Sequence, residues 1–315
     1  MLHRRLSSLQ RLCLRGGIAA RLKWTATEKH SFSANRAAKP HTMAPRSTKS
    51  AFAKKSLGQN FIVDQNYVRK IIASLDLTQT DTVVEIGPGR GAITENLVES
   101  RASVIAIELD RDLVPQLRAQ FSDSPNFTVI EANATEVDLA SLLKDQSSKV
   151  QDQRAKLVAN LPYYISTPIL QHLSTQRHLF DSLILMFQKE VVDRITAKPG
   201  DSERGFLTVL VEAAFDVEKL FDVPPNAFRP VPKVTSAVAR FTPKPSQIKD
   251  EEAFRRLVST AFSQKRKTIL NNLKTAYPDS REALERAGID GSRRAETLTL
   301  AEWLLLTEQL ERLDV

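Results

Sequence analysis

The chain has 315 residues, 42% of them hydrophobic, and a formal net charge of +8 at pH 7. This length allows one large or two modest domains with apolar cores, and no apolar run approaches the roughly 20 residues that span a bilayer. The single cysteine, Cys13, excludes an internal disulfide and a cysteine-based zinc cluster, and the histidines show no metal-ligand spacing.

The positive charge is concentrated in two segments. Residues 1–55 contain 13 Lys or Arg and one acid, and residues 226–274 contain 11 Lys or Arg and three acids. This asymmetry is typical of a protein with a polyanionic partner such as a nucleic acid. A solvated arm and one charged face would give the same composition.

Residues 1–53 are predicted to form a disordered basic arm, because they have too little periodic apolar sequence to form a core. Within the arm, residues 1–42 are rich in Arg, Leu, Ser and Ala and poor in acids, which is typical of an organellar transit peptide. Alternatively, Met43 is the true start of the protein. We favour the second interpretation, which predicts a cytoplasmic protein; a transit peptide would lead it to the mitochondrial matrix.

From residue 54 onwards, apolar strands alternate with segments of helical periodicity. Strands are expected at 82–86, 103–107, 127–130, 157–159 and 182–187, and helices at 67–75, 92–97, 111–120, 188–196 and 205–214. This alternation predicts an α/β fold with a parallel sheet covered by helices on both faces. Two later strands, 217–221 and 236–241, are separated only by a proline-rich loop and are predicted to pair antiparallel.

The sequence from Pro243 to Ser246 is a stiff linker and indicates a boundary between an α/β domain, 54–243, and a second domain, 246–315. Residues 252–313 have helical periodicity throughout, with turns expected at Ala287-Gly288 and Gly291. The stretch 261–273 is expected to be one helix.

A glycine-rich turn, Gly87-Pro-Gly-Arg-Gly91, lies between the first strand and the following helix, where glycines let a ligand approach the backbone. Glu108 ends the second strand, 21 residues after Gly87, where an acid can bind both hydroxyls of a ribose. Asn133 and Asn160 follow the third and fourth strands. Because the carboxyl ends of parallel strands share one edge of a sheet, these residues predict a nucleoside cofactor site. The alternative is a tight turn at the glycines and a helix N-cap at Glu108.

The segment Asn160-Leu-Pro-Tyr163 follows a short apolar strand. The amide oxygen of Asn160 can accept a hydrogen bond from an exocyclic amine, and Pro162 leaves the turn without an N–H at that position. The ring of Tyr163 can stack on a base. Together with a nucleoside cofactor, the segment suggests methyl transfer to an amino group of a nucleobase, although out of context it could be a structural turn.

Several segments occur in an order that resembles the ribosomal RNA adenine dimethyltransferase family, most closely its bacterial KsgA branch. They are KSLGQNF (55–61), VEIGPG (84–89), IELD (107–110), NLPY (160–163), QKEV (188–191), PPNAFRPVPKVTSAV (224–238) and AFSQKRK (261–267). The resemblance covers roughly residues 54–315. It implies a Rossmann-like class I methyltransferase sheet followed by a smaller all-helical C-terminal domain.

The resemblance implies S-adenosylmethionine as the cofactor, with no metal. It assigns the donor site to these residues: Asn60, the backbone of Ile62, Gly87, Gly89, Glu108, Asn133 and Asn160. The family usually has Asp at position 133, so donor affinity could be weaker here. The implied reaction is the dimethylation of N6 on two adjacent adenines in the 3′-terminal hairpin of small-subunit ribosomal RNA, on 30S particles, by a monomer.

For the target base, the resemblance implies that Asn160 and the carbonyl of Leu161 hold the adenine amino group, within the catalytic segment Asn160–Tyr163. Phe228 is a candidate to sandwich the base opposite Tyr163, although a Phe in such a loop is more often a core residue. Phosphate contacts are expected from Lys233, Lys265, Arg266 and Lys267.

Alternative functions remain open at this point. A large-subunit ribosomal RNA methyltransferase would resemble the chain in its catalytic domain. A non-catalytic RNA-binding assembly factor, or a mitochondrial transcription factor on the same fold, would belong to a different functional class.

Overall fold

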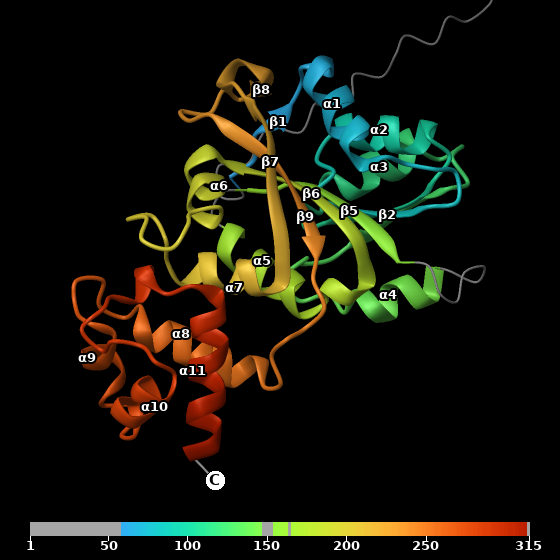
Figure 1. Cartoon of the computed structure of the whole chain (residues 1–315). Coiled ribbons are helices and arrows are strands. Elements are labelled where there is room, and N and C mark those ends of the chain that lie inside the picture. Colours follow the sequence, from blue (N-terminus) through green and yellow to red (C-terminus); the bar gives the residue numbers. More distant parts are fainter. Residues whose placement is uncertain (1–57, 147–153, 163–164, 314–315) are drawn as a thin grey trace, which may run out of the picture. The chain divides into compact units, whose positions relative to one another are not determined.

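A seven-stranded sheet forms the centre of the α/β part of the protein in the computed structural model (Figure 1). The structure describes residues 58–146, 154–162 and 165–313, so the predicted arm at 1–53 and Tyr163 lie outside the described residues. The strands are β2 (Thr82–Ile86), β3 (Ser103–Glu108), β4 (Phe127–Glu131), β5 (Ala155–Asn160), β6 (Phe180–Gln188), β7 (Phe215–Val223) and β9 (Ser236–Pro243).

The strand order is β4-β3-β2-β5-β6-β9-β7, in which β2 to β6 are parallel and β9 runs antiparallel to both of its neighbours. The predicted parallel sheet and the predicted antiparallel pairing of the two late strands are therefore confirmed. Since consecutive side chains of a strand point to opposite faces, Val83 and Val84 pack in different apolar clusters on the two sides of the sheet.

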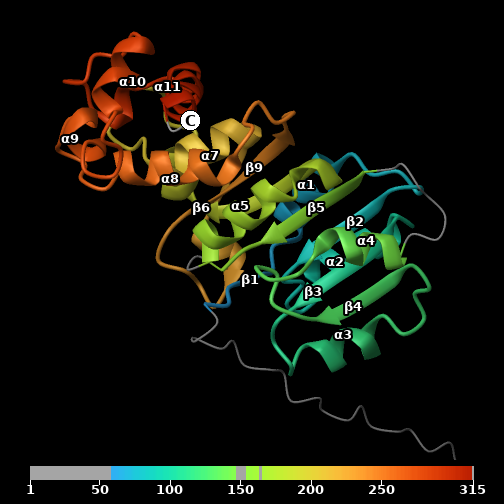
Figure 2. The same cartoon turned by 90° about the horizontal axis from the view of Figure 1, so that it is seen from below.

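Helices cover both faces of the sheet. The helices are α1 (Gln65–Leu75), α2 (Ala92–Glu99), α3 (Val114–Gln120), α4 (Leu139–Gln146), α5 (Ser166–Thr175), α6 (Lys189–Ile195) and α7 (Phe206–Ala214). Apolar residues of α1, α2 and α3 pack on one face, and those of α4 to α7 pack on the other. Figure 2 views the sheet from the side that α4 and α5 cover.

Two of the helices that cover the sheet, α4 and α5, were not predicted. Each is short, and α5 carries Pro168 near its start among Ser and Thr residues, which are weak helix formers. Leu139 of α4 and Ile169 of α5 are completely buried against the sheet. Tertiary burial, rather than a local pattern, therefore accounts for these helices.

A second, two-stranded sheet pairs β1 (Phe61–Ile62) with β8 (Phe228–Arg229), and this sheet was also not predicted. Phe61 lies opposite Arg229 and Ile62 opposite Phe228. The pairing holds residues 58–62, here called the strap, beside the main sheet. The backbone N–H of Val63 extends the pairing by donating to the carbonyl of Ala227 at 2.8 Å.

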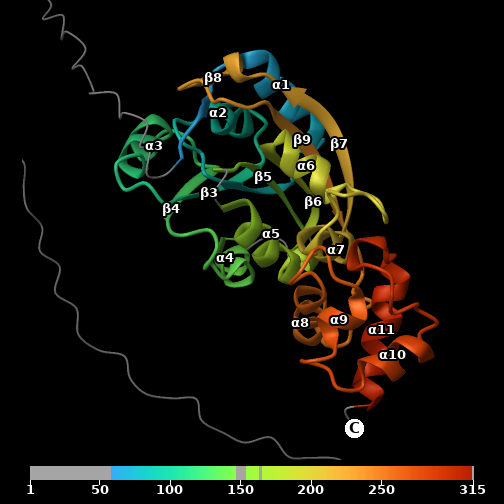
Figure 3. The same ribbon diagram turned by 90° about the vertical axis from the view of Figure 1, so that its left-hand side faces the viewer.

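The C-terminal part is helical, as predicted. It contains α8 (Glu251–Ala261), α9 (Ile269–Leu273), α10 (Ser280–Arg286) and α11 (Leu300–Leu313). Its core includes Phe254 and Trp303, and also Val209 of α7, which is fully buried in the same cluster. Figure 3 shows α7 beside these helices. The proposed boundary between domains 54–243 and 246–315 stays a prediction.

The prediction of one helix over 261–273 is wrong, because α8 ends at Ala261 and α9 begins at Ile269. The side-chain amide of Asn272 donates to the carbonyls of Ala261 at 2.6 Å and Gln264 at 3.2 Å, and thereby satisfies backbone groups that a continuous helix would pair. Thr268 caps α9 by accepting from the N–H of Asn271 at 3.3 Å. Residues 262–268 therefore form a turn.

None of the helices in the described ranges is both long and apolar enough to cross a membrane.

Candidate functional site

A cavity of about 220 Å³ opens at the carboxyl edge of the main sheet. Five segments far apart in the sequence form its wall: the strap, the turn after β2, the end of β3, the residues after β4, and those after β5. They contribute Gly58–Phe61, Ile86, Gly87, Gly89, Ile107–Leu109, Ala132–Thr135, Asn160–Pro162, Ile165 and Pro168. Nearly all of the predicted cofactor residues are in this set. Ile62 is the exception, one residue beyond the part of the strap that lines the cavity.

The glycine turn has the backbone that the prediction requires. Gly87 and Gly89 have φ angles of 69° and 59°, in the left-handed region that favours glycine. A Cβ atom on Gly89 would lie 2.9 Å from Cδ1 of Phe61 in the strap. Glycine is therefore needed at position 89 both for its conformation and for the close approach of Phe61.

Glu108 is only 6% exposed and lies on the cavity wall. One carboxylate oxygen accepts from the N–H of Asp110 at 2.8 Å, and the other accepts from the N–H of Gly89 at 3.1 Å. Burial raises the pKa of Glu108 above its ordinary value, although these backbone N–H groups oppose the effect. Each oxygen has a second lone pair, so the carboxylate can still accept from two ribose hydroxyls.

A second buried acid, Glu85, was missed by the sequence reasoning. It lies in β2, is 2% exposed, and accepts a hydrogen bond from the hydroxyl of Thr94 at 2.7 Å. Burial raises the pKa of Glu85 to about 8, and the nearby charge of Glu108 adds to this effect. The available signal was a carboxylate inside an otherwise apolar strand, which is costly unless the group is neutral or paired.

Asn133 lies on the cavity wall, but its amide is already engaged in a local turn. Its oxygen accepts from the N–H of Thr135 at 3.1 Å and from the hydroxyl of Thr135 at 2.9 Å, and its nitrogen donates to Glu136 at 2.7 Å. The predicted hydrogen bond from an adenine amino group to the Asn133 oxygen would therefore compete with Thr135. This role stays a prediction.

Asn160 ends β5, and its side-chain nitrogen donates to the backbone carbonyl of Asn60 in the strap at 3.1 Å. Since the two ends of an amide point apart, this bond directs the Asn160 oxygen away from the strap. Leu161 is held by its own N–H, which donates to the carbonyl of Met186 in β6 at 3.3 Å. Asn160, Leu161 and Pro162 share the cavity wall with Glu108.

Phe228 does not occupy the position that was expected for a base-stacking ring. It is 1% exposed and packs with Ile62, Val68 and Met186 in the apolar cluster behind the strap. In this structure the side chain is a core residue, the alternative that the sequence had left open. Stacking on a base would require it to leave the core.

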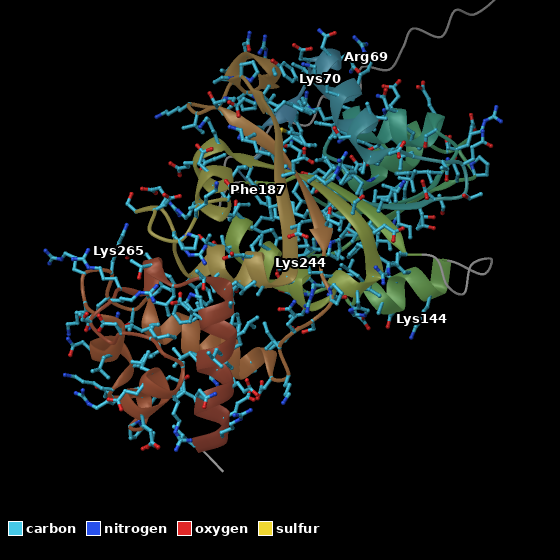
Figure 4. All side chains as sticks on the ribbon, in the orientation of Figure 1. Arg69, Lys70, Lys144, Phe187, Lys244 and Lys265 are labelled. Carbon is cyan, nitrogen blue, oxygen red and sulfur yellow. The ribbon has the colours of Figure 1, made fainter. Side chains whose placement is uncertain are left out.

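The predicted RNA-binding residues lie in two separate loops. Lys233 is exposed between β8 and β9, while Lys265, Arg266 and Lys267 are exposed in the turn between α8 and α9. The Nζ atom of Lys265 donates to the carbonyl of Ser202 at 2.7 Å, so part of its hydrogen-bonding capacity is used within the protein. Figure 4 shows Lys265 at the edge of the helical part.

Within residues 58–146, 154–162 and 165–313, no group of three or more His, Cys, Asp or Glu side chains is placed to hold a metal ion.

The strand order, with antiparallel β9 between β6 and β7, and a cavity at the carboxyl edge lined by a glycine turn and a strand-terminal acid define a class I methyltransferase. The family model for ribosomal RNA adenine dimethylase matches residues 51–312, and the chain belongs to this family.

Individual relatives support the family assignment. The chain is 44% identical over 266 residues to ribosomal RNA small subunit methyltransferase A of Geobacter metallireducens, and this match covers 82% of this chain and 95% of the relative. Among solved structures it is similar to a dimethyladenosine transferase from Plasmodium falciparum, with a TM-score of 0.68, 27% identity, and coverage of 81% of this chain and 98% of that chain. It is also similar to the 23S rRNA methyltransferase ErmE, with a TM-score of 0.58, 26% identity, and coverage of 80% and 100%.

Proposed function

We propose that the protein transfers methyl groups from S-adenosylmethionine to N6 of two adjacent adenines in the 3′-terminal hairpin of small-subunit ribosomal RNA. The product is N6,N6-dimethyladenine, formed during assembly of the 30S particle. The observation that carries the proposal is that Asn160 and Glu108 line one cavity. A group that can accept from an amine thus shares a cavity with a group that can bind a ribose.

The cavity wall offers a suitable group for each part of the donor. Glu108 offers both carboxylate oxygens to the ribose hydroxyls, and Gly87, with no side chain, leaves space at the turn for the methionine portion. Asn133, on the same wall, is assigned to the adenine end, where the adenine amino group would compete with Thr135 for its oxygen. When bound, S-adenosylmethionine supplies a methyl group on a positively charged sulfur, which makes that carbon open to nucleophilic attack.

The residues around the target amine act mainly by positioning. The lone pair of adenine N6 is delocalised into the ring, so the amine is a poor nucleophile. The Asn160 oxygen and the Leu161 carbonyl accept its two hydrogens and favour a tetrahedral nitrogen whose lone pair faces the methyl carbon. The new N–C bond forms as the C–S bond breaks, and the methylated nitrogen then loses a proton to water. This step needs orientation rather than a strong base.

A second methylation requires the spent cofactor to be replaced and leaves one N–H on the target. Asn160 or Leu161 then has one hydrogen to accept instead of two. We propose that the same site performs both transfers.

Recognition of the folded RNA is assigned to charge outside the cavity. Lys233 and the turn that contains Lys265, Arg266 and Lys267 would contact phosphates, which orient the substrate without reading sequence. We further propose that the protein acts as a monomer on the 30S particle in the cytoplasm. If residues 1–42 are a transit peptide, the same reaction belongs to the mitochondrial matrix.

The similarity to ErmE favours one alternative, a large-subunit ribosomal RNA methyltransferase. A methylation assay distinguishes the small-subunit from the large-subunit activity. Purified 30S and 50S particles that lack the modification are incubated separately with the protein and methyl-labelled S-adenosylmethionine. We expect label only in 30S particles, released by digestion as N6,N6-dimethyladenosine. Label in 50S particles would identify the alternative, and no label in either would indicate a non-catalytic assembly factor.

A further inference from the structure

We infer that Gln59 is a positioning residue for methyl transfer, because its side chain anchors the strap that orients Asn160. This inference rests on the proposed function. The Gln59 side-chain nitrogen donates to a carboxylate oxygen of Asp110 at 2.9 Å, and this hydrogen bond is here called the latch. Its two ends are 51 residues apart in the sequence.

The partner of the latch is rigidly held. Asp110 is 3% exposed, and its other carboxylate oxygen accepts from the N–H of Asp112 at 3.0 Å. Its own backbone N–H donates to Glu108 at 2.8 Å. The latch therefore attaches the strap to the same turn that supports the proposed ribose-binding carboxylate.

The residue after Gln59 carries the other connection. The backbone carbonyl of Asn60 accepts from the side-chain nitrogen of Asn160, at the 3.1 Å described above. Consecutive Cα atoms are only about 3.8 Å apart across a rigid peptide unit, so a shift at Gln59 is passed to the Asn60 carbonyl. The direction of the Asn160 oxygen thus depends on a bond made at position 59.

The two halves of the strap are held by different contacts. Phe61 packs against Gly89 with the Arg90 guanidinium 4.7 Å from its ring centre, and Ile62 is buried and paired with Phe228. These contacts fix the C-terminal half without the latch. The latch fixes the half that bears the Asn60 carbonyl, so its loss should loosen that half while the fold persists.

The chemistry of the latch favours a neutral donor at position 59. An amide can donate to the buried Asp110 carboxylate without adding a charge beside Glu108. A glutamate would place a second carboxylate against Asp110, and repulsion between the two would open the latch. Glutamine is therefore suited to hold the strap, and its replacement by glutamate should be harmful despite the equal size.

Replacement of Gln59 by Ala should lower the single-turnover methylation rate on 30S particles at saturating donor by roughly 10- to 100-fold, the range expected for misplacing a reacting group by about 1 Å. The affinity for S-adenosylmethionine, measured by calorimetry, should change less than the rate, and the melting temperature should change little. Gln59→Met, which keeps the volume of the side chain but not its donor, provides the same test if the alanine variant does not fold.

Two further variants serve as a control and as a rescue test. Gln65→Ala removes an exposed glutamine at the start of α1 and should leave the rate unchanged. In Gln59→Glu combined with Asp110→Asn, the new amide can donate to the new carboxylate while its oxygen still accepts from Asp112. This double variant should recover most of the rate that Gln59→Glu alone loses.

A Gln59→Ala rate within twofold of wild type, or a double variant no better than Gln59→Glu, would overturn the positioning role. A rate loss matched by an equal loss of donor affinity would assign Gln59 to donor binding instead. Absence of product with the wild-type protein would refute the proposed function itself, which is a different result from an active wild type with an equally active Gln59→Ala.

Discussion

At the residue scale, two neighbouring strands of the sheet, β2 and β3, each carry a buried carboxylate, and the two have different surroundings. Glu108 faces the cavity and is supported by backbone N–H groups, whereas Glu85 lies inside the sheet and has a hydroxyl donor from Thr94. Burial raises the pKa of both. Because only Glu108 lines the cavity, the two acids should affect different measurable properties.

Donor affinity should depend on the charge of Glu108. Glu108→Gln removes charge-assisted hydrogen bonds worth roughly 1.5–3 kcal/mol each, so the Kd for S-adenosylmethionine should rise at least about tenfold at pH 7. For the wild type, affinity should fall as pH drops through the raised pKa of Glu108, and this dependence should vanish in the variant. Calorimetry across pH measures both effects. Unchanged binding by Glu108→Gln would contradict the assignment, and Glu95→Gln on the exposed face of α2 is the control.

Glu85 should make stability depend on pH. Its ordinary pKa is 4.5 and its pKa in the fold is about 8, so between these values the folded protein keeps a proton that the unfolded chain has lost. The free energy of unfolding should therefore decrease as pH rises through this window. In Glu85→Gln that decrease should be smaller, by on the order of a few kcal/mol. Urea unfolding at pH 5 and pH 8 tests this, and equal pH slopes for both proteins would rule it out.

Asn160 should act on turnover rather than on binding. Asn160→Ala removes an acceptor that is needed most as the amine becomes tetrahedral, so the single-turnover rate should fall far more than RNA affinity. Rapid-quench methylation and filter binding of 30S particles measure the two properties. A variant with near-normal single-turnover methylation would show that Asn160 does not position the amine.

At the element scale, the turn between α8 and α9 differs from its prediction in a way that affects RNA recognition. Asn272 and Thr268 hold it in place, and Lys265 already donates to Ser202 in the loop before α7. Arg266 and Lys267 are exposed in the same turn, so they are the residues best placed to contact phosphate. Lys265 should contribute less than either of them.

Neutralising Arg266 and Lys267 with Gln should weaken 30S binding and flatten its salt dependence, by about one log–log unit at most for each lost phosphate contact. Donor affinity should not change, since neither side chain lines the cavity. The matched control, Lys274→Gln with Arg281→Gln, removes the same charge from exposed positions elsewhere in the helical part. If the salt slopes of both variants parallel that of the wild type, these residues form a solvated surface and do not contact RNA.

At the scale of the whole molecule, α7 belongs to two cores. Leu207 and Val211 pack on the main sheet, while Val209 is fully buried among the helices of the C-terminal part. Because α7 contributes to both cores, unfolding of the sheet part would expose apolar surface of the helical part, and the reverse also holds. We therefore expect the proposed domains 54–243 and 246–315 to unfold as one cooperative unit.

Trp303 tests this coupling, because it is completely buried in the helical core, far along the chain from the donor site. In a Trp24→Phe background it is the only tryptophan of the chain. Saturating S-adenosylmethionine should raise the melting temperature reported by Trp303 fluorescence by as much as that reported by circular dichroism. If the donor does not change the melting temperature reported by Trp303 fluorescence, the two parts unfold independently.

The sequence predicted most of the sheet and, with the family resemblance, at least one residue in each of the five segments that form the cavity wall. The strand at Thr82–Ile86 was predicted with its observed ends, because a buried apolar run bounded by a glycine turn is a local signal. Gly87, Glu108 and Asn160 could be brought together from their places after successive strands, since parallel strands have their carboxyl ends at one edge. Each inference needed only neighbouring residues and one topological rule.

Only the tertiary structure decided the contacts that act across the chain. The bond between Asn160 and Asn60 spans 100 residues, and the β1–β8 pairing joins strands of two residues each, too short for any periodicity to be detected. The burial of Phe228 follows from that pairing, and the division of α7 between two cores follows from what packs on either side of it. Local sequence patterns indicate which residues prefer to be buried or extended. They do not indicate which distant residues will contact them, because those contacts depend on how the whole chain packs.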